Sequence, residues 1–106
     1  MILRVRSEAN AEVSEALTWL VQRGRFRVVT ALRNAWQTAQ DAIAATPRQF
    51  PPAEDGPDGF EVRNYLVRRF GYRVIYVVTA TECVIVSFRR GRRGAAQWQS
   101  RVTDGP

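Results

Sequence analysis

The stretch Tyr72-Arg73-Val74-Ile75-Tyr76-Val77-Val78-Thr79 decides how this chain folds. It consists almost wholly of β-branched and aromatic residues, which favour strands. It also lacks the alternation of apolar and polar residues that marks a strand with one face in water. Residues 72–79 are therefore predicted to form the central strand of a sheet that is covered on both faces.

Two more strands are predicted, one before and one after this segment. Residues 60–69 carry apolar side chains on both faces of an extended segment, and residues 83–88 have the composition of another buried strand. Short turns at 70–71 and 80–82 separate the strands. Because strands joined by short turns run in opposite directions, this half of the chain predicts a three-stranded antiparallel meander.

The N-terminal half predicts one strand and two helices. Residues 2–6 alternate apolar and basic side chains, which is typical of a short strand. Apolar residues then recur at helical spacing in two segments, of which the first ends at Gly24 and the second spans 26–45. The second ends before Pro47, since a residue that precedes proline avoids helical angles. With so short a break between them, the two helices are expected to form an antiparallel hairpin.

The remaining segments are a loop, a short helix and a tail. Residues 46–59 are rich in proline, glycine and acidic residues and predict a long loop. A short helix is expected around 95–101, followed by a frayed tail at 102–106. The element order predicts a single α+β domain over residues 1–106, with the helical hairpin on one face of an antiparallel sheet.

The charge of the chain points to an acidic partner. Sixteen arginines and ten acidic residues give a net charge of +6, and there is no lysine and no histidine. Such a balance favours binding to nucleic acid or to an acidic protein, although a GC-rich genome would also enrich arginine. Without histidine, and with Cys83 as the single thiol, we expect no metal site and no cofactor.

The sequence also carries no sign of a membrane segment. No apolar run approaches the ~20 residues of a membrane span. Charged residues occupy the N-terminal stretch that would be apolar in a signal peptide. We therefore expect a cytoplasmic protein that makes no membrane contact.

The strongest candidate for a binding surface is a cluster of arginines near the C-terminus. Arg89, Arg90, Arg92 and Arg93 place four positive charges within five residues. Guanidinium groups bind phosphates and carboxylates through paired hydrogen bonds, so the cluster predicts a docking surface, with a solvated turn as the alternative. Trp98 follows one turn later and is interpreted either as an interface anchor or as a packing residue.

Three stretches together carry a resemblance to a known family. They are Val5-Arg6-Ser7-Glu8-Ala9, the segment 62–76 with its Arg69-Phe70-Gly71-Tyr72 turn before an apolar strand, and Arg90-Gly91-Arg92-Arg93 followed by Trp98. In this order they resemble the RelE/ParE superfamily of toxins from bacterial type II toxin–antitoxin systems. Gly71 stands where that family usually has proline, which is expected to loosen the turn, and Arg90 stands where many members have histidine.

The resemblance implies one of two activities, with a related domain that has lost its toxicity or a general basic binding module as the remaining alternative. The ParE-like branch binds DNA gyrase without cutting anything, and the RelE-like branch cleaves messenger RNA in the ribosome. Arginine is a poor proton acceptor, so the absence of histidine favours the gyrase-directed branch. Either branch implies neutralisation by a cognate acidic antitoxin.

The resemblance also implies roles for particular residues. Target or antitoxin binding would involve Arg73, which matches a phosphate-binding arginine of nuclease relatives, together with the arginine cluster and Trp98. If the chain were a nuclease, its catalytic residues would be Arg73, Arg90 and Tyr76. Other proton acceptors stay open in that case, namely Glu54, Glu61, Tyr65 and Tyr72.

Overall fold

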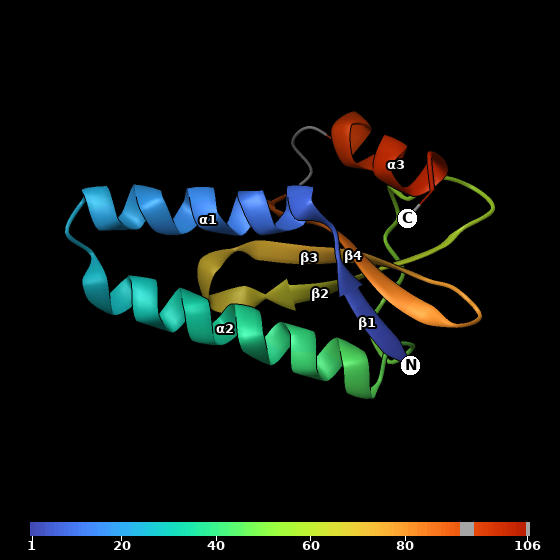
Figure 1. Ribbon diagram of the computed structural model, residues 1–106, viewed down its shortest axis with the longest axis horizontal. Coiled ribbons are helices and arrows are strands. Elements are labelled where there is room, and N and C mark those ends of the chain that lie inside the picture. The colour runs from blue at the N-terminus through green and yellow to red at the C-terminus, as the bar shows by residue number, and fades with distance from the viewer. Residues whose placement is uncertain (92–94, 106) are drawn as a thin grey trace.

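The computed structural model describes residues 1–91 and 95–105, with three helices, a short 3₁₀ helix and four strands in this part of the chain (Figure 1). Their order is β1 (Ile2–Val5), α1 (Ser7–Gln22), α2 (Phe26–Ala45), β2 (Glu61–Val67), the 3₁₀ helix η1 (Arg68–Phe70), β3 (Tyr72–Val78), β4 (Glu82–Arg90) and α3 (Ala95–Thr103). This order confirms the α+β class that the sequence predicts.

The four strands form one mixed sheet in the order β1-β4-β3-β2. β2 pairs with β3 and β3 with β4 in antiparallel fashion, whereas β1 runs parallel to β4, with Ile2 opposite Glu82 and Val5 opposite Ile85. The expectation of a purely antiparallel sheet is therefore wrong. β1 meets a strand that lies far along the chain, so no local turn signal indicates the direction in which it pairs.

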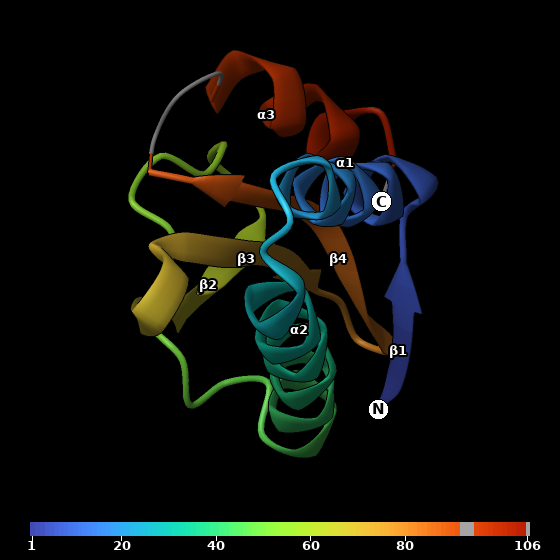
Figure 2. The ribbon, with the colours of Figure 1, turned by 90° about the vertical axis from the view of Figure 1, so that its left-hand side faces the viewer.

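The sheet is covered on both faces, as Figures 1 and 2 show. The antiparallel hairpin of α1 and α2 packs on one face, where Tyr76, Ile85 and Phe88 join the helices in the larger core. α3 packs on the other face, over Ile75 and Val84. Every residue of β3 after Tyr72 is buried, which confirms the prediction of a central strand covered on both sides.

The C-terminal segment is docked on the protein, contrary to the frayed tail expected from residue 102 onward. Val102 is fully buried in the core beneath α3. Nη1 of Arg6 donates to the carbonyl oxygens of Arg101 and Gly105, each at 2.8 Å. The tail is thus held by a side chain from the opposite end of the sequence, which no local pattern indicates.

Gly71 has a more specific role than the loose turn predicted from its sequence. It follows η1 with a φ of 71°, in the left-handed region, and completes the reversal from β2 into β3. Proline holds φ near −65°, so it is unable to occupy this position without changing the turn. A turn with this positive φ therefore requires glycine at position 71.

Candidate functional site

Arg89 and Arg90 are the last two residues of β4, which extends two residues beyond the strand predicted over 83–88. Adjacent strand residues point to opposite faces of a sheet. In the register, Arg89 lies opposite Arg73 and Arg90 lies opposite Tyr72. Arg89 therefore lies on the face that α3 covers, and Arg90 lies on the face that the helical hairpin covers. The other two members of the predicted cluster, Arg92 and Arg93, lie outside the described residues.

Arg73 is an internal residue that is only 6% exposed. Its Nη1 and Nη2 donate to the two carboxylate oxygens of Asp55 at 2.9 and 2.6 Å, and its Nε donates to the carbonyl oxygen of Gly91 at 2.7 Å. This bidentate pair joins the long loop to the start of β3. Arg73 is therefore occupied by the chain itself, and we leave it out of the candidate binding surface.

Arg89 is held in a second internal network, which is centred on Glu12 of α1. The Glu12 carboxylate accepts from Nη2 of Arg89 at 2.8 Å and from Nη1 of Arg101 at 3.0 Å. It also accepts from the Ser87 hydroxyl at 2.9 Å and from the backbone N–H of Phe88 at 3.1 Å. One carboxylate thus connects α1, β4 and α3.

Tyr76 and Trp98 are both fully buried. The Tyr76 hydroxyl donates to the carbonyl oxygen of Pro47 at 2.5 Å, and burial raises the pKa of Tyr76 to about 12. A phenol with so high a pKa is a poor general base. Trp98 belongs to α3 and packs against the sheet with its ring 5.8 Å from the Arg73 guanidinium, so it fits the packing interpretation.

The other proton acceptors left open by the sequence are dispersed. Glu61 accepts hydrogen bonds from Arg63 and Arg48, and the Arg63 bond is the main reason why the pKa of the Glu61 carboxyl is lowered. The Tyr65 ring packs edge-on against Phe50. Of these candidate proton acceptors, Tyr72 is the one that lines a surface pocket together with Arg90, within the described residues.

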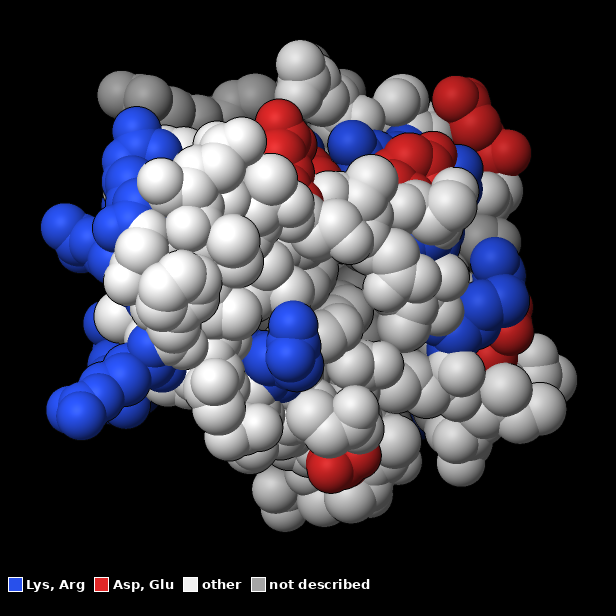
Figure 3. All heavy atoms as spheres, turned by 60° about the vertical axis from the view of Figure 1, so that its left-hand side comes forward, with Lys and Arg blue, Asp and Glu red and all other residues white. Residues whose placement is uncertain are grey.

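A different set of arginines is available to a partner. Seven of the arginines in the described part of the chain form no ion pair with a described carboxylate: Arg23, Arg25, Arg27, Arg33, Arg68, Arg69 and Arg90. All except Arg33 lie in or beside three segments, namely the α1–α2 turn, η1 and the C-terminal end of β4. These segments lie together at one end of the molecule, which we call the hairpin end (Figure 2). Figure 3 shows basic side chains projecting from it.

The hairpin end contains a pocket of about 820 Å³ between the two helices and the sheet. We call it the hairpin-end pocket. Its lining combines four aromatic rings, three arginines, two glutamates and an aliphatic floor: Trp19, Phe70, Tyr72 and Phe88; Arg25, Arg69 and Arg90; Glu12 and Glu15; Ala16, Leu20, Val28 and Leu32. Its size is in the range of pockets that hold small ligands or single anchoring groups.

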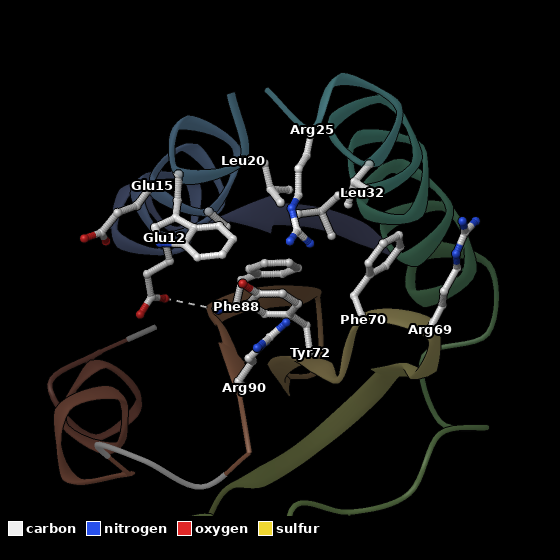
Figure 4. Close-up of a pocket in the computed structure, with 13 residues that line it drawn as sticks. Glu12, Glu15, Leu20, Arg25, Leu32, Arg69, Phe70, Tyr72, Phe88 and Arg90 are labelled. Carbon is white, nitrogen blue, oxygen red and sulfur yellow. Dashed lines mark hydrogen bonds between the residues drawn. The ribbon is translucent and has the colours of Figure 1, made fainter. Parts of the chain in front are cut away.

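Aromatic and cationic groups are layered inside this pocket. The rings of Tyr72 and Phe88 are stacked with centroids 4.4 Å apart, and the Arg90 guanidinium lies 5.1 Å from the centroid of Tyr72. Arg25 extends from the α1–α2 turn toward Phe88 (Figure 4). The Glu15 carboxylate points away from these rings in the same view, whereas the Glu12 carboxylate accepts from the backbone N–H of Phe88.

No pattern in the sequence indicates this pocket as a site. Arg69, Phe70 and Tyr72 belong to a stretch that was singled out for its resemblance, but Trp19 and Arg25 carried no comparable signal. Residues from α1, from the helix turn and from the sheet meet there only after folding. The one usable hint is that basic residues flank both the helix turn and the η1 turn.

Comparisons with known proteins add no assignment, because no known family model matches the chain and no curated protein matches it. Within the described residues, none of the helices is both long enough and apolar enough to cross a bilayer. The same part of the chain holds no group of three or more Cys, Asp or Glu side chains placed to bind a metal ion.

Proposed function

We propose that this protein is a growth-inhibiting toxin similar to the ParE-like branch, which binds DNA gyrase and is neutralised by a cognate acidic antitoxin. The observation that carries the proposal is the gathering of arginines at the hairpin end. These side chains have no carboxylate partner among the described residues, while the chain's own carboxylates pair with arginines elsewhere. A surface of this kind fits a negatively charged macromolecule.

The order of elements supports the toxin family. The resemblance implies an opening strand, two helices, a turn leading into an apolar strand and a final basic segment before an aromatic residue, and the chain has this order.

The internal contacts of two residues favour binding over RNA cleavage. Arg73 and Tyr76, which a RelE-like nuclease would use, are both engaged by groups of this chain. Arg90 retains access to solvent, but a guanidinium supplies charge and does not take up a proton near neutral pH. Messenger cleavage is therefore the alternative that the experiment must exclude.

The experiment compares the two targets directly. Purified protein is added to a gyrase supercoiling reaction and, in parallel, to a translation reaction in which the ends of the message are mapped. We expect supercoiling to be inhibited and the message to stay intact. Codon-positioned cuts that disappear with Arg73→Ala would overturn the proposal in favour of the nuclease.

Variants then locate the surface. The double variant Arg69→Ala with Arg90→Ala should lose both the inhibition of supercoiling and the growth arrest seen on expression. Arg33→Ala is the matched control, because it removes an exposed arginine that has no ion pair in the described structure and lies outside the pocket. A separate Arg92→Ala with Arg93→Ala variant tests the remaining predicted positions, which lie outside the described residues. Growth arrest that persists in both double variants would remove these residues from the site.

A further inference from the structure

Exposed aromatic residues accompany the arginines of the hairpin end. Trp19 is 48% exposed and Phe26 is 65% exposed, although both rings are large and apolar. The Arg23 guanidinium lies 3.7 Å from the centroid of the Trp19 ring, and Arg25 and Arg27 flank Phe26 in the sequence. Apart from the Arg23 contact on Trp19, these rings leave apolar surface open to solvent that a ligand with a flat apolar surface would cover.

The pocket beside them continues the same pattern inward. Trp19 forms part of its wall, and Phe70 and the stacked pair of Tyr72 and Phe88 supply further ring surface. Arg25 and Arg90 bring guanidinium groups to the interior, as Figure 4 shows. Ring surface and positive charge therefore lie next to each other in this pocket.

We infer that the hairpin end binds single-stranded nucleic acid, with a base held against the aromatic rings of the hairpin-end pocket and phosphates held by Arg25, Arg69 and Arg90. Unpaired bases stack on aromatic side chains, and the adjoining phosphates need cations at short range. Guanidinium groups bind phosphate oxygens through paired hydrogen bonds and also stack on rings. The neighbouring rings and guanidinium groups at this end supply both kinds of contact.

Two observations favour a single strand over other acidic partners. An acidic peptide and a single strand would both pair with the arginines, but a single strand also supplies flat bases to the open rings of Trp19 and Phe26, and the comparison with polyglutamate separates the two. A duplex keeps its bases stacked inside the helix, where a pocket in a protein surface does not reach them without base flipping. The carboxylate of Glu12 is already taken up by internal donors, which limits its repulsion of phosphate.

This inference is separate from the proposed gyrase inhibition, although the two share Arg69 and Arg90 of the hairpin end. It is compatible with it, because gyrase acts on DNA and an inhibitor docked there would lie near nucleic acid. The test contains neither gyrase nor ribosomes, so its failure would leave the proposed function to be judged by its own assays.

The experiment measures the fluorescence anisotropy of a labelled oligothymidine, titrated with the full chain at several salt concentrations. If three phosphates are held, the slope of log K against log salt should be about −2, since each contributes ~0.7 in single strands. Arg90→Ala should make the slope shallower by about 0.7 and weaken binding. Arg33→Ala, which lies outside the pocket, should leave affinity nearly unchanged apart from the small effect of net charge.

A second variant separates stacking from charge. Trp19→Ala keeps the net charge and should weaken oligonucleotide binding roughly tenfold, which is the scale of one lost base–ring contact. Circular dichroism of each variant shows that it is folded. Affinity that is unchanged by Trp19→Ala would overturn the proposed stacking, and an equal affinity for duplex DNA or for polyglutamate would show that only charge is recognised and would overturn the inference.

Discussion

The α3 side of the sheet and the hairpin end use the same side chain in opposite ways. On the α3 side, Arg73 and Arg89 are buried or nearly so, and each is bound by a carboxylate of this chain. At the hairpin end, Arg69 and Arg90 are exposed and have no such partner among the described residues. The difference teaches that a run of arginines in a sequence does not by itself mark a binding surface.

Solvation explains the division. A guanidinium removed from water must be paired and hydrogen-bonded, because an unpaired buried charge is very unfavourable. An exposed guanidinium keeps its hydration and needs no partner, so it remains available to a ligand. The first group is therefore expected to contribute to stability and the second to binding, and the following variants test that separation.

The largest effect is expected at Glu12. Glu12→Ala leaves Arg89 and Arg101 partly buried without their carboxylate and should lower the free energy of unfolding by about 3 kcal/mol. Glu15→Ala is the control, because Glu15 is on the same helix and lines the same pocket but is exposed. It should change stability by less than about 0.5 kcal/mol. Urea denaturation measures both, and equal losses would break the comparison.

Asp55 should show the next largest effect. Asp55→Ala removes the bidentate partner of Arg73 and should lower the free energy of unfolding by about 2 kcal/mol. Asp58→Ala removes an exposed carboxylate from the same loop and is expected to be close to neutral. If both variants had the same urea midpoint as the wild type, the ion pair of Asp55 with Arg73 would contribute nothing to stability.

The exposed arginines should behave in the opposite way. Arg69→Ala should alter the free energy of unfolding by no more than about 0.5 kcal/mol, because the side chain is exposed and has no ion pair in the described structure. The same variant should weaken binding of the labelled oligothymidine, as measured by the fluorescence anisotropy titration. A variant that loses stability and keeps full binding would place Arg69 in the structural group.

Acid pH provides the smallest and most graded test, through the ion pair of Glu8 with Arg6. The hydrogen bond from Arg6 lowers the pKa of Glu8 to about 2 from an ordinary 4.5. Because the folded-state pKa is the lower one, this pair stabilises the fold above about pH 4.5, and its contribution is lost as the pH falls toward 2. The thermal midpoint of Glu8→Gln should therefore fall less steeply over this range than that of the wild type. Parallel curves would show that Glu8 contributes nothing.

Local patterns predicted an element well where the physical cause of its formation lies within one short segment of the sequence. The unbroken β-branched run of 72–79 requires cover on both faces, and β3 has it. Gly24 adopts a φ of 68°, which suits the break between the two helices, and α2 ends just before Pro47 as expected. In each case the preference arises from neighbouring residues and survives folding.

The candidate site was less accessible from sequence, because its partners are distant along the chain. Arg73 was predicted to bind phosphate, yet it pairs with Asp55 in a loop whose course no pattern determines. The Arg89-Arg90 pair reads as one cluster, but a strand sends its two side chains to opposite faces. Neither outcome follows from residue type alone.

The amino-acid sequence by itself determined the α+β class, the helical hairpin, the central strand and the excess of positive charge. Only the tertiary structure decided that β1 runs parallel to β4, that the C-terminal segment is docked, and which arginines remain open to a partner. The physical reason is the separation along the chain of the residues that interact. Helix and strand preferences act between close neighbours, whereas pairing of charges depends on which distant groups folding brings within a few ångströms.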